Sequence, residues 1–148
     1  MQRLKYLALA PFAMAAASLA HADTHDVFGT FATPAGTSHV TIADCGDGTP
    51  CGTVSWIDPA VMPEGYGPED ALTRSGEQVL GYTILQGFDR KKKDWRGGTI
   101  YDPEADRTYA ARLKRLANGD LQMKGCLGPM CQTQTWPSVS AEPISAAD

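Results

Sequence analysis

The sequence predicts an all-β protein, a single antiparallel up-and-down β-barrel of about eight strands. Short runs in which apolar and polar residues alternate follow one another along the chain, and Gly- and Pro-containing turns separate them. Without a candidate leader at residues 1–22, 126 residues remain, which is the size of one domain. A meander of such strands removes its exposed edges by closing into a barrel.

The first two predicted strands cover residues 27–32 and 38–43, and a Pro-Ala-Gly turn separates them. In the second strand, Val40 and Ile42 alternate with polar residues. This period of two gives the strand one apolar and one polar face, as expected of a strand that covers a core on one side.

A third strand is predicted at residues 53–57, with Val54 and Trp56 expected on the same face. Residues 58–78 are rich in Pro, Gly and Glu and show no period, which predicts a long excursion over the surface. The alternation resumes in a fourth strand at residues 79–85.

The remaining strands are predicted at residues 95–101, 109–116, 121–124 and 133–136. The middle two form the clearest hairpin, because apolar and polar residues alternate on both sides of the tight-turn pair Asn118-Gly119. A helix is the competing interpretation of residues 109–116, which are rich in Ala, Arg, Leu and Lys. The alternation and the turn favour the strand.

The four cysteines form two close pairs, Cys45 with Cys51 and Cys126 with Cys131. Four cysteines allow three disulfide pairings, of which local closure within each pair is the simplest, because each pair brackets a Gly/Pro turn. A zinc site would normally have two to four residues between its cysteines, whereas five and four are found here, with no His nearby. Structural disulfides are therefore favoured.

Residues 1–22 have the three parts of a cleavable secretory signal. Arg3 and Lys5 form a basic start, residues 7–20 are apolar, and Ala20-His21-Ala22 matches the small-x-small pattern of a cleavage site. The protein is therefore expected to be periplasmic or secreted, with no transmembrane segment left after the signal is removed.

The expected domain covers residues 23–140, followed by a loosely ordered tail at 141–148 that is small, polar and broken by Pro. Because the signal holds two of the 13 basic residues and none of the 17 acidic ones, the rest of the chain carries a net charge of −6. An acidic domain is a poor candidate for binding nucleic acid, which requires Lys and Arg to neutralise phosphates.

No catalytic constellation, metal site or cofactor site is predicted. His25 and His39 are each interpreted as surface residues, since neither has an evident orienting partner. Asp102, Glu104 and Asp106 alternate as calcium ligands do, but the other ligands and the Gly of a calcium-binding hand loop are missing. A Pro-containing turn with solvated acids is the favoured interpretation.

Two groups of residues remain as candidate binding sites. The first is the basic run Arg90, Lys91, Lys92 and Lys93, which either forms a solvated loop or binds anionic lipid headgroups with Trp95 as an interfacial anchor. The second is a set of large side chains at strand spacing that could line a barrel interior or form its core. This set is Trp56, Tyr82, Tyr101, Tyr109, Leu113 and Met123.

Four stretches together resemble domain-of-unknown-function family 2147, a family of small exported bacterial proteins. They are Cys45 to Trp56, Gly81 to Phe88, Gly97 to Pro103 with Tyr109, and Gly125 to Trp136. The resemblance implies a lipocalin-like barrel in the periplasm and no established activity.

Gly29-Thr30-Phe31 is also similar to the Gly-x-Trp that opens lipocalin barrels. In lipocalins that Trp packs beneath an Arg from the last strand. Gln132 stands here where many family members carry an Arg.

The leading functional hypothesis is binding of a small apolar or amphipathic molecule in the barrel mouth. It depends on export, a single domain, an inferred closed meander and a supply of aromatic residues, and otherwise on analogy with the fold. The alternative is a structural or protein-interaction module of the cell envelope with a filled barrel and no ligand. A packed interior would favour the module, and a connected apolar pocket would favour the binder.

Overall fold

The computed structural model describes residues 23–139, so the predicted signal and tail lie outside the described residues. The strands in this range are β1 (Gly29–Ala32), β2 (Ser38–Asp44), β3 (Pro50–Ile57), β4 (Thr83–Gln86), β5 (Asp89–Arg90), β6 (Trp95–Asp102), β7 (Arg107–Arg115), β8 (Leu121–Leu127) and β9 (Met130–Trp136). Two short 3-10 helices, η1 (Pro59–Val61) and η2 (Pro68–Asp70), lie between β3 and β4.

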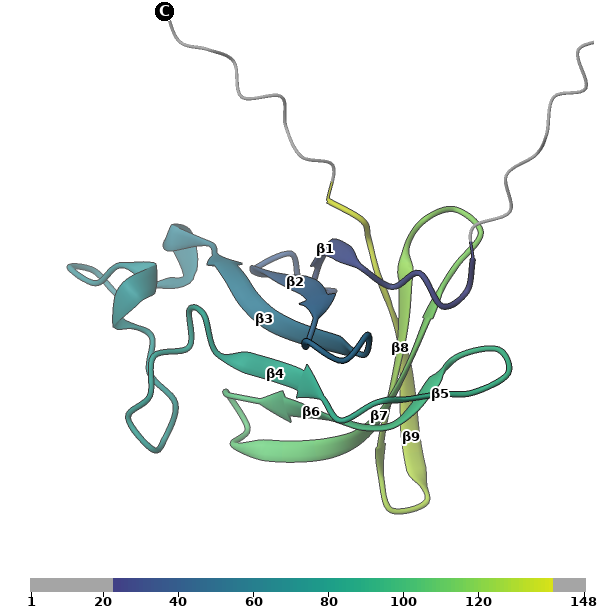
Figure 1. The fold of residues 1–148 in the computed structure, drawn as a ribbon. Helices are drawn as coiled ribbons and strands as arrows, with labels where there is room; N and C mark the ends of the chain where they lie inside the picture. Colours follow the sequence, from purple (N-terminus) through teal and green to yellow (C-terminus); the bar gives the residue numbers. More distant parts are fainter. Residues whose placement is uncertain (1–22, 140–148) are drawn as a thin grey trace, which may run out of the picture.

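The strands form one antiparallel meander in the order β1-β2-β3-β4-β6-β7-β8-β9, and the short β5 pairs with β6 beside this path. The chain after β9 returns to β1. The Ala32 N–H donates to the Pro137 carbonyl at 2.9 Å, and the Val139 N–H donates to the Thr30 carbonyl at 2.9 Å. The sheet thus curls into a half-barrel (Figure 1), and residues 137–139 beyond β9 contact β1 through the bridge between Phe31 and Ser138. The predicted all-β fold is confirmed.

Apolar side chains from both halves of the meander fill the space inside the curled sheet. The largest fully buried ones are Phe31, Ile42, Leu85, Leu113 and Leu121, and they belong to one continuous cluster. Each such side chain stabilises the fold by about 1.5–3 kcal/mol relative to an exposed position. The alternation predicted in β2 is seen in the structure, since Val40 and Ile42 are buried and their neighbours are less so.

The buried ring of Phe31 is covered by Arg115, at the end of β7. The Arg115 guanidinium lies 5.0 Å from the ring centroid and donates hydrogen bonds to the carbonyls of Asp26 and Phe28, at 3.2 and 3.0 Å. The protein therefore has an aromatic ring packed beneath an arginine, as the resemblance to lipocalins implies. The arginine comes from β7 and not from the position of Gln132.

The predicted surface excursion is longer than expected, because β4 begins at Thr83 and not at residue 79. Gly81 has a φ of 87°, a left-handed conformation that interrupts an extended strand. Its N–H still donates to the Val54 carbonyl at 2.7 Å, so the excursion returns directly to the sheet. Within the described range, no helix has the length and apolar character needed to cross a membrane.

Both cysteine pairs form disulfides, Cys45–Cys51 between β2 and β3 and Cys126–Cys131 between β8 and β9. Each closes its own turn, the pairing that the spacing favours. Residues 107–115 form strand β7 and not a helix, and Gly119, with a φ of 92°, makes the tight turn into β8.

Candidate functional site

The six large side chains expected to line the barrel divide into three groups. Leu113 and Met123 are cross-strand partners with exposed fractions of 1% and 5%, so they are part of the core. Three tyrosines, Tyr82, Tyr101 and Tyr109, are half-buried and pack against the edge of the same core. Trp56, the sixth, lies elsewhere.

Trp56 does not share a face with Val54, so the prediction that it lines the interior is wrong. Val40 pairs with Val54 and His39 pairs with Trp56, which leaves Ser55 as an extra residue in β3. Such a bulge shifts the alternation by one, so the side chains beyond it change face. Trp56 is 37% exposed and its ring lies 4.4 Å from that of His39, which the sequence correctly placed on the polar face.

The structure therefore brings most of the predicted lining residues together as packed core and core edge. Two hollows in the described part of the chain lie at the surface beside charged side chains. One is bordered by residues of β7 and β8 and by Asp94, which precedes β6; the residues of the two strands are Arg112, Leu113, Lys114, Gln122 and Lys124. The other lies at the turn between β5 and β6.

The hollow at the β5–β6 turn is lined by four cationic side chains, Lys91, Lys92, Lys93 and Arg96, and has a volume of about 380 Å³. The predicted basic run thus gathers around one concave site, joined by Arg96, which the sequence analysis did not include. Arg90 turns away from it, since its guanidinium lies 5.7 Å from the centroid of the Trp95 ring.

Trp95 is not an interfacial anchor, and this part of the lipid-patch prediction is wrong. Its side chain is 4% exposed, and its indole N–H donates to the His25 carbonyl at 2.8 Å. As the first residue of β6, Trp95 points into the core, where its ring also meets the His25 ring edge-on at 6.1 Å.

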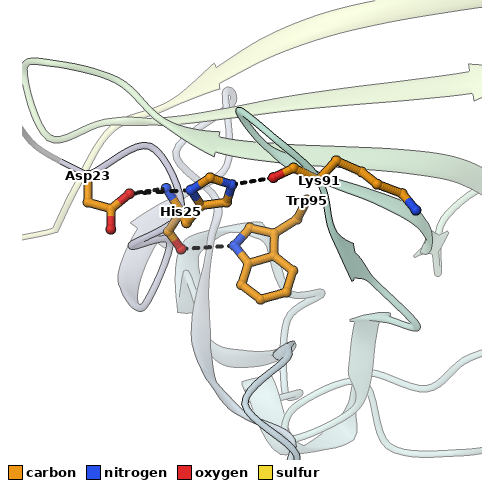
Figure 2. Close-up of polar contacts among 4 residues, drawn as sticks. All are labelled: Asp23, His25, Lys91 and Trp95. Carbon is orange, nitrogen blue, oxygen red and sulfur yellow. Dashed lines mark hydrogen bonds and ion pairs between the residues drawn. The ribbon is translucent and has the colours of Figure 1, made fainter.

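His25 holds the basic turn in place from 66 residues away in the sequence (Figure 2). Its Nε2–H donates to the Lys91 carbonyl at 2.7 Å, while Nδ1 lies 3.4 Å from Asp23 Oδ1. The residue is 9% exposed, so its interpretation as a surface histidine is wrong. A fixed backbone at Lys91 means that the cationic side chains extend from a preorganised turn, which lowers the entropy lost on binding.

Two neighbouring carboxylates are already engaged within this region. The His25 backbone N–H donates to Asp23 Oδ1 at 2.9 Å, and this hydrogen bond lowers the pKa of Asp23 below its usual value. The Asp94 carboxylate accepts from Arg96 Nε at 2.7 Å. Because Asp94 interacts with Arg96, the lysine ammonium groups remain available to an incoming anion.

The acidic turn after β6 is a hydrogen-bonded turn and not a group of free ligands. Asp102 Oδ1 accepts from the backbone N–H groups of Glu104 and Ala105, and Asp106 Oδ1 accepts from the Tyr101 hydroxyl at 2.8 Å. That last hydrogen bond, helped by burial and by the nearby negative charge, raises the pKa of Tyr101 to about 12.

We expect Asp106→Asn to move the pKa of Tyr101 towards its ordinary value of 10.0, because the hydrogen bond to the charged carboxylate, the main cause of the rise, is replaced by one to a neutral amide. Asn also tolerates the φ of 50° at this position. Since the folded pKa is raised, the contribution to stability is complete below pH 10 and is lost as the pH rises towards 12. A tyrosinate absorbance titration, with Tyr101→Phe to assign the signal, measures the shift. An unchanged titration in Asp106→Asn would contradict it.

Comparisons with known proteins agree with this architecture. A family model described as "Uncharacterized protein conserved in bacteria (DUF2147)" matches residues 29–137. The fold is similar to that of protein HP1028 from Helicobacter pylori, which is described as belonging to the lipocalin family. The TM-score is 0.58, with 80% of this chain and 86% of that chain covered at 21% identity, so the likeness concerns the fold alone. No curated protein matches the chain.

Proposed function

Because the chain belongs to the bacterial family DUF2147, whose description names no activity, we propose its function from its own geometry. It is an exported, non-catalytic protein of the periplasm, with residues 1–22 removed as a signal, a domain at 23–140 and a tail at 141–148. It acts through its outer surface and binds anionic groups at the β5–β6 turn. The observation that carries this proposal is that four cationic residues line one hollow of an anchored turn.

The ligand chemistry follows from the donor set. Three ammonium groups and one guanidinium provide charge-assisted hydrogen bonds, and phosphate oxygens are the acceptors that such groups bind most strongly. The chain after residue 22 has a net charge of −6, so the cations of this turn oppose its overall charge. Arg112, Lys114 and Lys124 add further cationic residues at the neighbouring hollow. A phosphate in a lipid headgroup and a free phosphate share this chemistry.

We expect the double variant Lys92→Gln/Lys93→Gln to bind anionic vesicles about 30-fold more weakly, since each lysine near such a surface contributes about 1 kcal/mol. Vesicles of neutral lipid with a fraction of phosphatidylglycerol serve as the probe, and co-sedimentation measures the affinity. The matched control is Lys114→Gln/Lys124→Gln, which removes the same charge from the outer face of β7 and β8. Equal losses in both variants would contradict a specific site.

A binding measurement with inorganic phosphate distinguishes a free phosphate from a lipid headgroup as the ligand. Calorimetric binding of phosphate to the protein, lost in Lys92→Gln/Lys93→Gln, would assign the site to a free phosphate group. Binding to anionic vesicles alone would assign it to a membrane surface. Binding to neither would overturn the proposal.

A second candidate function is binding of a small apolar or amphipathic molecule at the barrel mouth, which the lipocalin-like fold favours. Its contacts would come from the half-buried Tyr82, Tyr101 and Tyr109. The packed cluster beneath them supports the filled-barrel alternative instead. Native mass spectrometry of protein purified from its own periplasm, beside a refolded control, tests this candidate. An added mass lost on denaturation would support it, and a clean mass that ignores added fatty acids would exclude it.

A further inference from the structure

Within the described residues 23–139, strand β9 has one edge with no strand beside it over residues 130–136. Every residue of β9 pairs with β8 on the other side, from Leu121 with Trp136 to Leu127 with Met130, without a register shift. The contact with β1 begins only beyond β9, where Phe31 pairs with Ser138. In Figure 1 the β8–β9 hairpin accordingly extends away from the rest of the sheet.

The backbone groups that point away from β8 can be identified from the alternation of the ladder. In antiparallel pairing, successive residues direct their N–H and C=O to opposite sides. The Pro137 carbonyl and the Val139 N–H point to β1. In a strand without a bulge, the backbone N–H and C=O groups of Cys131, Thr133 and Thr135 therefore point to the same side, away from β8. These three residues therefore present a row of hydrogen-bonding groups that β8 does not use.

This edge lacks the features by which proteins prevent edge-to-edge pairing. Natural edges are usually short, charged, bulged or broken by Pro. Residues 130–136 form seven residues of regular strand, Met-Cys-Gln-Thr-Gln-Thr-Trp, with no charge and no Pro. Their side chains are mostly exposed, and Met130 at 79% is the most exposed large apolar side chain of the described residues.

We propose that β9 pairs antiparallel with β9 of a second copy of this chain, about a two-fold axis at Thr133. In this register the outward-directed residues lie opposite one another, Thr133 against Thr133 and Cys131 against Thr135 of the second copy. The three pairs would form about six hydrogen bonds. The two sheets would then join into one continuous sheet across the interface.

The self-complementary sequence of β9 is the reason for a second copy as the occupant. Around Thr133 the strand reads almost the same in both directions, so Gln132 lies opposite Gln134 of the second copy, amide against amide. Met130 lies at the end of the paired segment, where its exposed side chain would be covered by the second copy. No like charges meet, which is the usual obstacle when identical strands pair.

Two variants test this interface, Thr133→Lys by charge repulsion and Thr133→Pro by removal of a backbone N–H. Thr133→Lys places two ammonium groups opposite each other, which we expect to raise the dimer dissociation constant at least about tenfold. Thr133→Pro removes an N–H that β8 does not use, as tolerated in edge strands, and should abolish the pairing while the barrel stays folded. Thr108→Lys is the matched control, since Thr108 is an exposed threonine of β7 that pairs with Tyr101 of β6 and lies outside the proposed interface.

The exported protein, purified with both disulfides intact, is measured by light scattering and sedimentation over about a hundredfold range of concentration. A dimer in the parent and in Thr108→Lys that dissociates in both Thr133 variants supports the proposal. Slow amide exchange at Thr133 and Thr135, lost in Thr133→Lys, supports the same register. A parent that is monomeric throughout, or a dimer that persists in both Thr133 variants, would overturn it. Circular dichroism shows whether each variant is folded.

Discussion

Replacing Phe31 with alanine is expected to lower the free energy of unfolding by about 3–5 kcal/mol. The side chain is fully buried, and its ring contacts the cluster that joins the two halves of the meander. The truncation also removes the ring beneath the Arg115 guanidinium, at 5.0 Å, so that the charge loses a cation–π partner. Urea denaturation measures the loss as a lower midpoint with an unchanged slope.

Two further variants separate the contribution of the Phe31 ring to stability from that of the Arg115 guanidinium. Phe31→Leu keeps most of the apolar volume and should cost less than the alanine variant. Arg115→Gln keeps the ring and loses the guanidinium, together with its hydrogen bonds to Asp26 and Phe28. If Phe31→Ala cost less than about 1 kcal/mol, the ring would not be the core contact described here.

Replacing Gly98 with alanine is expected to cost about 1–3 kcal/mol, although only one methyl group is added. Gly98 lies in β6 directly against the ring of Phe88, and a Cβ at this position would overlap Phe88 Cδ1. Phe88 is 2% exposed and cannot move without disturbing the core around it. The strand must therefore shift or the ring must leave its preferred rotamer.

Gly125→Ala is the matched control, because it adds the same group to a strand glycine of the same sheet. The nearest atom to a Cβ at Gly125 is Met123 Sδ at 3.8 Å, which is ordinary contact, so this variant should be close to neutral or slightly stabilising. In a Phe88→Leu background the cost of Gly98→Ala should fall, and the difference is the coupling between the two residues. Thermal unfolding of the parent, Gly98→Ala, Phe88→Leu and the double variant measures this coupling. Equal costs for the two glycine variants would contradict the overlap.

Much of the fold could be predicted because its signals are local. Alternation in residues such as Val40 and Ile42, and the Asn118-Gly119 turn, are properties of a few neighbouring residues, and they identified β2 and the β7–β8 hairpin. The signal for the disulfides is also local, since each cysteine pair flanks its own turn. In the candidate site, the lysine run was visible for the same reason.

The errors arose where a side chain's position depends on a distant partner. Trp56 faces outward because Ser55 is an extra residue relative to β2, and a register shift is a relation between two strands. Trp95 is buried and His25 positions the basic turn through contacts that span about 70 residues of sequence. The Arg115 guanidinium over Phe31 also joins opposite ends of the meander.

Sequence patterns alone predicted the fold class, strands that pair in chain order, local closure of each cysteine pair as the simplest pairing, and the lysines of one turn. The three-dimensional structure was needed to see that large side chains expected near a cavity form core and core edge, and that His25 anchors the lysine turn. It also revealed that one edge of β9 has no neighbouring strand among the described residues. The physical reason is that the alternation of apolar and polar residues shows only which residues can share a face of a strand. Which face turns inward, and what meets it there, is set by register and closure of the whole sheet.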